Sequence, residues 1–141
     1  MRILILTQFY PPEFGAAAVR LSRLARLLAA DGHAVTVLTG MPNYPEGVIR
    51  AGYRGRVLMR EMLDGVNVER VWVYASPSKG TRARLLNQFS FMAMAALRGV
   101  FLSRADVILV ESHPLFVCLT GGWLKRVKRA PVVLNVSDLW P

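Results

Sequence analysis

Short apolar runs recur along the chain, and segments long enough to be helices separate them. The apolar runs occupy residues 3–7, 34–39, 66–74, 106–110 and 132–136, and the helical segments occupy residues 16–30, 81–102 and 115–127. Most of the runs are continuously apolar rather than alternating, which is typical of parallel strands covered by helices on both faces. This order predicts an α/β fold with a Rossmann-like, doubly wound parallel sheet.

The third strand is expected to be the second arm of a hairpin. Residues 57–63 and 66–74 flank Asp64-Gly65, a dipeptide that favours a two-residue turn between antiparallel strands. Residues 40–47 hold two glycines, two prolines and Asn43, so this segment is predicted to be a loop.

The order of the strands predicts where a ligand would bind. In a doubly wound sheet the usual order of the first five strands is 3-2-1-4-5, which opens a crevice between strands one and four. Ligands bind there, outside the carboxyl ends of the strands. The predicted site is therefore lined by residues 8–15, by residues 111–114, and by Ser137 and Asp138.

The chain is strongly basic, with 18 Lys and Arg residues against nine Asp and Glu residues and a formal charge of +9. This excess favours anionic partners such as phosphate, nucleic acid or membrane lipid. The basic residues form three main clusters: Arg20, Arg23 and Arg26; Lys79, Arg82 and Arg84; and Lys125, Arg126, Lys128 and Arg129. The first cluster is typical of a solvated helix face. Apolar residues precede the third, so an interfacial membrane contact and a core-facing helix with a basic end both remain open.

Several classes of protein lose support. A length of 141 residues fits one domain. The absence of G-x-G-x-x-G and of the P-loop motif argues against a dehydrogenase or an ATPase. No apolar stretch reaches the roughly 20 residues that a bilayer span requires, and the N-terminus does not resemble a signal peptide, so a cytoplasmic location is expected. Cys118 is the only cysteine, which excludes an intramolecular disulfide and a cysteine metal cage.

Four motifs carry a resemblance to a known family. Residues 3–15 read Ile-Leu-Ile-Leu-Thr-Gln-Phe-Tyr-Pro-Pro-Glu-Phe-Gly; Pro-Asn-Tyr-Pro follows at 42–45, Asp-Gly-Val at 64–66 and Ser-Asp-Leu-Trp-Pro at 137–141. Together they resemble the N-terminal domain of GT-B fold glycosyltransferases of family 4. Pro-Asn-Tyr-Pro together with Asp-Leu-Trp-Pro is similar to the branch that builds bacterial surface polysaccharides, including fucosamine and colanic-acid transferases. The resemblance spans essentially the whole chain.

The resemblance implies two Rossmann-like domains that face each other across a cleft, the first holding the acceptor and the second the nucleotide-sugar. Residues 1–141 would be the N-terminal acceptor-side domain, incomplete and lacking the donor-binding domain, and this fragment alone is expected to be inactive. The full-length protein is expected to be a retaining glycosyltransferase that uses neither metal nor cofactor. Its expected partners are a nucleotide-sugar donor and a lipid-linked polysaccharide acceptor, with peripheral attachment at the inner face of an anionic membrane through Lys125, Arg126, Lys128 and Arg129.

The resemblance also implies roles for particular residues. Gly15 matches the family's glycine loop after strand one, whose backbone approaches the donor diphosphate, although a loop glycine or helix cap would have the same spacing. Many members carry a His-Asp pair after the fifth strand, and this chain has Ser137-Asp138, so only Asp138 is carried over as catalytic. Asp138 could bind a sugar hydroxyl or accept the acceptor's proton, and a capping hydrogen bond is an equally ordinary use. His113 is the second catalytic candidate, as an acceptor contact or proton carrier.

Four further residues are predicted to bind substrate or diphosphate: Glu13, Asn43, Tyr44 and Glu111. The two glutamates belong to the loops expected at the crevice. Asn43 and Tyr44 could contact a sugar through an amide and an aromatic ring, although a rigid loop between prolines is the plainer account.

Two functions of other classes stay open. A noncatalytic α/β module could bind anionic lipid or a phosphorylated ligand through its basic face. The charge also permits nucleic-acid binding, but no recognised motif supports it, so nucleic acid is not an expected partner.

Overall fold

The computed structural model describes residues 1–137, so the predicted catalytic residue Asp138 lies outside the described part of the chain. The elements follow in the order β1 (Arg2–Leu6), α1 (Ala16–Ala30), β2 (Ala34–Gly40), β3 (Leu58–Leu63), β4 (Val66–Val71), α2 (Thr81–Phe101), β5 (Val107–Glu111), α3 (Val117–Lys128) and β6 (Val132–Asn135).

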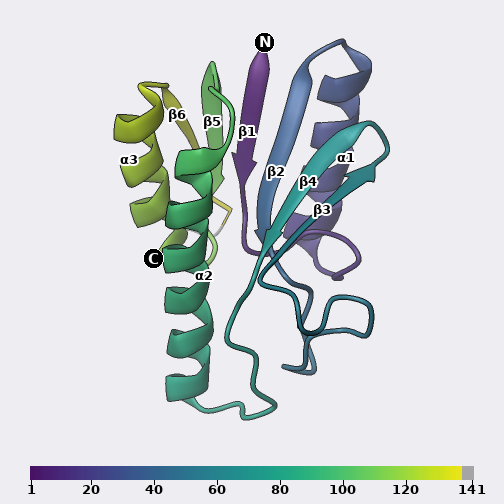
Figure 1. Ribbon diagram of the computed structural model, residues 1–141, viewed down its shortest axis with the longest axis vertical. Helices are drawn as coiled ribbons and strands as arrows, with labels where there is room; N and C mark the ends of the chain where they lie inside the picture. Colours follow the sequence, from purple (N-terminus) through teal and green to yellow (C-terminus); the bar gives the residue numbers. More distant parts are fainter. Residues whose placement is uncertain (138–141) are drawn as a thin grey trace.

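The strands form one sheet in the order β3-β4-β2-β1-β5-β6 (Figure 1). Every neighbouring pair is parallel except β3 and β4. Without the antiparallel edge strand β3, the order of the remaining five is the predicted 3-2-1-4-5. The predicted doubly wound sheet is therefore confirmed, and the hairpin adds one strand at its edge.

Helices cover both faces of the sheet, α1 on one and α2 with α3 on the other (Figure 1). Successive side chains of β1 point to opposite faces of the sheet, so they pack alternately against the two helical layers. Ile3 and Ile5 pack with residues of α1, whereas Leu4 and Leu6 belong to the core that includes residues of α2 and α3. A strand buried on both faces needs an apolar residue at every position, which explains the continuous apolar runs.

The hairpin turn between β3 and β4 has the backbone that its sequence requires. Asp64 and Gly65 have φ angles of 50° and 79°. A two-residue turn with both φ angles positive matches the twist of the strands, and Asp-Gly tolerates it well.

Strand β4 ends three residues earlier than predicted. Beyond Val71 the backbone leaves the parallel ladder: the amide of Trp72 donates to the carbonyl oxygen of Val57 at 2.8 Å, and that of Tyr74 donates to Ser90 Oγ of α2, also at 2.8 Å. Of residues 72–74, only Val73 is buried, in the core that includes Phe91 of α2, whereas Trp72 and Tyr74 are exposed.

One buried cation ties this edge of the sheet to the loop after β1. Arg70 on β4 is fully buried, and its Nε lies 2.5 Å from Glu61 Oε1 on β3. Its guanidinium donates to the carbonyl oxygens of Gly40 and Pro11 and stacks over the Tyr53 ring at 5.3 Å. This single side chain therefore fixes the hairpin, the end of β2 and the start of the β1–α1 loop relative to one another.

Helix α2 is the longest element, and it is packed beside α3. Phe91, Ala95 and Gly99 form its buried side. Within residues 1–137, no helix combines the length and the apolar character needed to cross a bilayer.

Candidate functional site at the carboxyl edge of the sheet

The carboxyl ends of the parallel strands gather the loops that the sequence predicted. The amide of Gly40 donates to the carbonyl oxygen of Gln8 at 3.4 Å, and the amide of Ser112 donates to that of Asn135 at 3.0 Å. These bonds hold the segments after β1 and β2, and after β5 and β6, side by side at one edge of the sheet.

A pocket of about 600 Å³ opens at this edge beside the N-terminus of α2, and we call it the α2 pocket. Polar and aromatic residues from four segments line it, including Gln8, Phe9, Asn43, Tyr44, Lys79, Arg84, Asn87 and His113. No Asp or Glu is among its lining residues in the described chain.

A second pocket of about 330 Å³ lies at the N-terminus of α1, and we call it the α1 pocket. Gly15, Arg20 and Ser137 line it together with Phe9, Tyr44 and His113. The last three residues also line the α2 pocket, so the two pockets share a wall.

Gly15 stands at the mouth of α1, as predicted. Its φ of 145° and ψ of 156° belong to a backbone region that residues with a Cβ rarely adopt. No side chain of residues 1–137 caps the first turn of α1, and that turn contains no acidic residue. Within residues 1–137, the first turn of α1 therefore has no capping side chain or acidic residue, an environment that favours an anionic group in the α1 pocket.

Glu111, at the end of β5, is fully buried and is held by three donors. Its Oε2 accepts from Arg20 Nη2 at 2.9 Å and from Asn135 Nδ2 at 2.7 Å, and its Oε1 accepts from Ser137 Oγ. Arg20 Nη2 also donates to Ser137 Oγ at 3.0 Å. The carboxylate therefore joins α1 to the ends of β5 and β6, and it orients Arg20 at the α1 pocket.

Glu13 is buried as well and fixes the loop after β2. Its Oε1 accepts from the backbone amides of Asn43 and Tyr44, each at 2.9 Å. Its Oε2 is buried without a hydrogen-bond partner among the described residues. Burial raises the pKa of Glu13 above its ordinary value, and the two amide hydrogen bonds oppose that rise.

An amide network forms the floor of the α2 pocket. Gln8 Nε2 donates to Asn87 Oδ1 at 2.5 Å, and Asn87 Nδ2 donates to Asn43 Oδ1 at 3.2 Å and to the carbonyl oxygen of Tyr74 at 2.7 Å. Asn43 Nδ2 in turn donates to the carbonyl oxygen of Met41 at 2.9 Å. The predicted residue Asn43 is thus one member of a network that links β1, the loop after β2 and α2.

Tyr44 and His113 lie on the wall between the two pockets. Tyr44 is 53% exposed, and its ring meets Phe9 edge to face with centroids 5.7 Å apart. His113 is exposed too. Four of the predicted site residues in the described chain line the pockets: Gly15, Asn43, Tyr44 and His113. Glu13 and Glu111 line neither pocket, and their hydrogen bonds hold the neighbouring loops in place.

The basic cluster at 125–129 lies at the end of α3, away from both pockets. Lys128 Nζ donates to the carbonyl oxygens of Val100 and Leu102 at the end of α2, and burial lowers the pKa of this ammonium. Lys125, Arg126 and Arg129 are exposed. The four predicted membrane contacts therefore divide into three surface cations and one that supports the fold.

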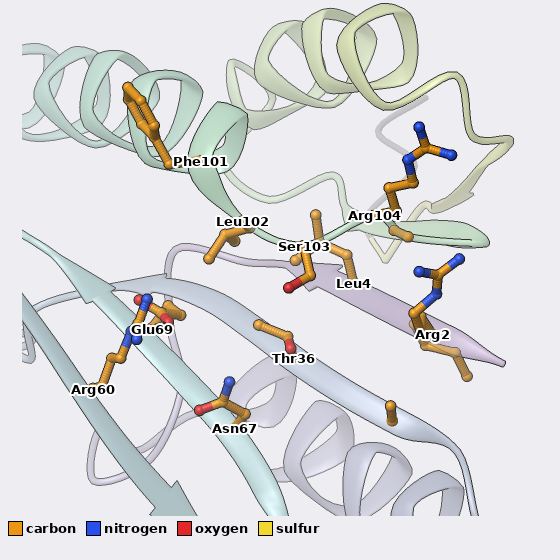
Figure 2. Close-up of a pocket in the computed structure, with 13 residues that line it drawn as sticks. Arg2, Leu4, Thr36, Arg60, Asn67, Glu69, Phe101, Leu102, Ser103 and Arg104 are labelled. Atoms are coloured by element: carbon orange, nitrogen blue, oxygen red, sulfur yellow. Dashed lines mark ion pairs between the residues drawn. The ribbon is translucent and has the colours of Figure 1, made fainter.

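A third hollow, of about 320 Å³, lies at the opposite edge, near the amino ends of β1, β2 and β4 (Figure 2). Figure 2 shows Glu69 beside Arg60, whose Nε is 2.6 Å from Glu69 Oε1. Arg98 binds the other carboxylate oxygen at 2.9 and 3.1 Å. Ligands of doubly wound sheets bind at the carboxyl ends of the strands, so this hollow is not the candidate site.

The sequence alone does not place Arg20, Asn87, Lys79 and Arg84 beside the candidate site. For Arg20 it favours a solvated helix face, because helical periodicity cannot reveal that Glu111, 91 positions away, lies against it. The sequence shows that Lys79 and Arg84 are close together in the chain. Their position beside a pocket depends on how far α2 extends past the edge of the sheet, which the sequence does not show (Figure 1).

Comparison with known proteins agrees with this architecture. The model of the glycosyl transferase 4-like domain family matches residues 15–141. The chain is 28% identical over 141 residues to the "Putative colanic acid biosynthesis glycosyl transferase WcaI" of Escherichia coli (strain K12), covering 98% of this chain and 34% of that protein.

A similar fold occurs in a solved structure described as trehalose-6-phosphate from E. coli bound with UDP-2-fluoro glucose, with a TM-score of 0.57 at 12% identity. The match covers 95% of this chain and 32% of that one. This chain thus spans about a third of the length of each protein. Because the family model matches most of its residues, the chain belongs to the glycosyl transferase 4-like domain family.

Proposed function

We propose that this chain is the N-terminal, acceptor-side domain of a retaining glycosyltransferase that moves a sugar from a nucleotide-sugar to a lipid-linked polysaccharide acceptor. The observation that carries the proposal is the pair of pockets at the carboxyl edge of the sheet, divided by Phe9, Tyr44 and His113. Two substrates that react with each other need adjoining sites, and this wall is where they would meet.

The α1 pocket is the proposed donor side. Breaking a sugar–diphosphate bond develops negative charge on the leaving group, which preorganised N–H groups and cations stabilise. Gly15 leaves the first turn of α1 open to such a group, and Arg20 adds a cation at the same pocket. The second domain of the full-length protein would supply the remaining donor contacts.

The proposed catalytic groups are His113 and Asp138. His113 lies between the pockets, where an imidazole can contact the acceptor hydroxyl or carry its proton. The role of Asp138 rests on the family resemblance. Glu13 and Glu111 are proposed to act through the loops they hold, because their carboxylates are buried in hydrogen bonds to Asn43, Tyr44, Arg20 and Ser137.

Peripheral attachment to an anionic membrane belongs to the same proposal. Leu119 and Trp123 are 63% and 49% exposed on one face of α3, close in sequence to the exposed cations Lys125 and Arg126. Residues 112–137 contain no acidic side chain. An apolar stripe with cations beside it suits the interface of an anionic bilayer, where a lipid-linked acceptor would be found.

A noncatalytic lipid-binding or phosphate-binding module remains the second candidate, because the same charge distribution would serve it. Product analysis separates the two. The full-length protein should convert a nucleotide-sugar and a bacterial lipid extract into a glycosylated lipid whose new bond keeps the donor's anomeric configuration by NMR. Inversion would contradict the retaining mechanism. Lipid binding without turnover of any nucleotide-sugar would favour the module.

A further inference from the structure

The hollow at the amino ends of β1, β2 and β4 is lined by polar residues that interrupt two inner strands of the sheet. Thr36 of β2 pairs in register with Asn67 of β4 and with Leu4 of β1. Leu4 packs in the core on the α2 side, so these three residues face that side of the sheet. Strands covered on both faces are normally apolar at such positions. The sheet is therefore polar beside the end of α2, whose last residue, Phe101, also lines the hollow.

Several hydrogen-bonding groups meet at this hollow without a protein partner. Figure 2 shows Thr36, Asn67 and Ser103 around the same open space. Within residues 1–137, none of these three side chains forms a hydrogen bond. The backbone amides of residues 103–105, which also line the hollow, donate to no backbone carbonyl of the described chain. Successive unpaired amides are donors that an anion can use.

A buried ion cluster gives the hollow an excess of positive charge. Glu69 is 2% exposed, and Arg98 binds its Oε2 through Nε at 3.1 Å and Nη2 at 2.9 Å. Arg60 Nε lies 2.6 Å from the other oxygen, although the Arg60 side chain is 68% exposed. Because Arg98 alone compensates the carboxylate, Arg60 adds a positive charge that Glu69 holds in place. Arg104, at the other end of the hollow, forms no ion pair within residues 1–137 (Figure 2).

The nearby sources of negative potential are compensated. The last carbonyl groups of a helix carry a partial negative charge, and at the end of α2 Lys128 Nζ donates to those of Val100 and Leu102. Asp106 accepts from the backbone amide of Arg2 at 2.7 Å and from its Nη2 at 3.1 Å. The hollow therefore favours an anion. Its volume of about 320 Å³ is at the lower end of the range of small-molecule sites.

We propose that this hollow binds a small phosphate ester, with the phosphate between Arg60 and the amides of residues 103–105. The hydroxyl groups of the ester would bond to Thr36, Asn67 and Ser103. A bound ester would connect the hairpin to the segment between α2 and β5. Inorganic phosphate shares the charged contacts and lacks the hydroxyl contacts. The site lies at the edge of the sheet opposite both pockets, so this inference does not rest on the proposed function.

The test is isothermal titration of the full-length protein with glycerol 3-phosphate, inorganic phosphate and glycerol. Saturable binding of glycerol 3-phosphate is expected, with weaker binding of inorganic phosphate and none of glycerol. Equal affinity for the two phosphates would overturn the hydroxyl contacts. No saturable binding of either phosphate would overturn the site.

Matched variants locate the cationic end of the site. Arg60→Gln should weaken binding of both phosphates by about tenfold or more, because it removes a charge-assisted hydrogen bond. Arg56→Gln removes the same charge from an exposed residue close by in the chain that does not line the hollow, and it should bind like the unaltered protein. Equal weakening by both variants would mean a diffuse charge effect and would overturn the assignment.

A second variant tests the hydroxyl contacts without disturbing an ion pair. Thr36→Val/Ser103→Ala removes two hydroxyl groups and should abolish the preference for glycerol 3-phosphate over inorganic phosphate. A preference that persists in this folded variant would overturn the proposed hydroxyl contacts.

A variant at the carboxyl edge separates this site from the α1 pocket. Arg20→Gln removes a cation from the α1 pocket and should leave binding of glycerol 3-phosphate unchanged. If Arg20→Gln weakens binding and Arg60→Gln does not, the phosphate occupies the α1 pocket and the proposal is refuted. Binding is measured without a nucleotide-sugar, so a failure of sugar transfer would contradict the proposed function and leave this site standing.

Discussion

At the residue scale, the case for donor binding is most specific at Gly15. Its positive φ suits glycine, and a Cβ there would meet no atom of the described residues within 4 Å, so space alone does not explain the residue. The φ of 145° does account for it, and a backbone that approaches a diphosphate, as proposed above, would be a second reason for glycine.

The change Gly15→Val should lower kcat/KM of the full-length enzyme by roughly 100-fold or more, the effect of losing a preorganised donor to the leaving group. The fold should persist, as judged by circular dichroism. Gly52→Val is the control, because Gly52 also has a positive φ and open surroundings but lines neither pocket. Turnover that falls equally in both variants would assign the loss to backbone strain.

Glu13 links residue chemistry to pH. Since its folded-state pKa is raised above the ordinary 4.5, this carboxyl contributes stability fully below its unfolded-state pKa and loses that contribution as pH rises through the folded-state pKa. Glu13→Gln keeps an oxygen for the amides of Asn43 and Tyr44 and cannot ionise. The Tm of Glu13→Gln minus the Tm of the unaltered protein should therefore be larger at pH 8 than at pH 4.

The neighbour Glu46 provides a matched substitution, because Glu46→Gln replaces a carboxylate that is exposed rather than buried. If the difference in Tm between Glu13→Gln and the unaltered protein is the same at pH 4 and pH 8, burial imposes no ionisation cost on Glu13.

The positions of the candidate residues were predictable to different degrees. Gly15 and His113 could be placed at the carboxyl edge of the sheet because each lies next to a strand or helix whose position the apolar runs reveal. The partners of Glu13 and Glu111 could not, because the bonds to Asn43 and Arg20 join residues 30 and 91 positions apart. Such pairs depend on how the loops close, and apolar periodicity carries no information about that.

At the scale of elements, apolar periodicity predicted each helix and parallel strand of residues 1–137, and the errors lay at their ends. Strand β4 was predicted too long because residues 72–74 are apolar or aromatic although their backbone has left the parallel ladder, and Trp72 and Tyr74 are exposed. The length of an apolar run reflects residue type, whereas a strand ends where its ladder hydrogen bonds end.

The hairpin is expected to depend on Arg70. Arg70→Met should lower the free energy of unfolding, measured in urea, by about 3–5 kcal/mol. The substitution leaves the Glu61 carboxylate without its ion-pair partner and two carbonyl oxygens without the hydrogen bonds that the guanidinium donates. Arg70→Met/Glu61→Met removes both charges and should recover part of the loss. A single variant as stable as the unaltered protein would show that the buried pair contributes nothing.

Helix α3 carries the membrane prediction. Lys125→Glu/Arg126→Glu should reduce binding to phosphatidylglycerol vesicles by about tenfold or more, since each basic residue near an anionic surface contributes roughly 1 kcal/mol. Arg23→Glu/Arg56→Glu makes the same change of net charge at exposed positions on other elements. Cosedimentation that falls equally in both pairs would indicate attraction by net charge rather than by a docking face.

At the scale of the whole molecule, the proposed function makes the described residues one wall of a cleft between two domains. Both pockets open at the same edge of the sheet, and the chain spans about a third of the relatives it matches. Retaining transfer requires donor and acceptor to be held together away from water, and positioning of this kind supplies much of the rate. On this proposal, residues 1–141 alone should bind a substrate but should not complete the reaction.

The most direct test measures transfer of labelled sugar from a panel of nucleotide-sugars to a bacterial lipid extract, with the full-length protein and residues 1–141 assayed side by side. We predict transfer by the full-length protein and none above the no-enzyme background by residues 1–141. Concentration-dependent transfer by residues 1–141 would contradict the division of the site between two domains, and no transfer by a folded full-length protein would contradict the assignment as a glycosyltransferase.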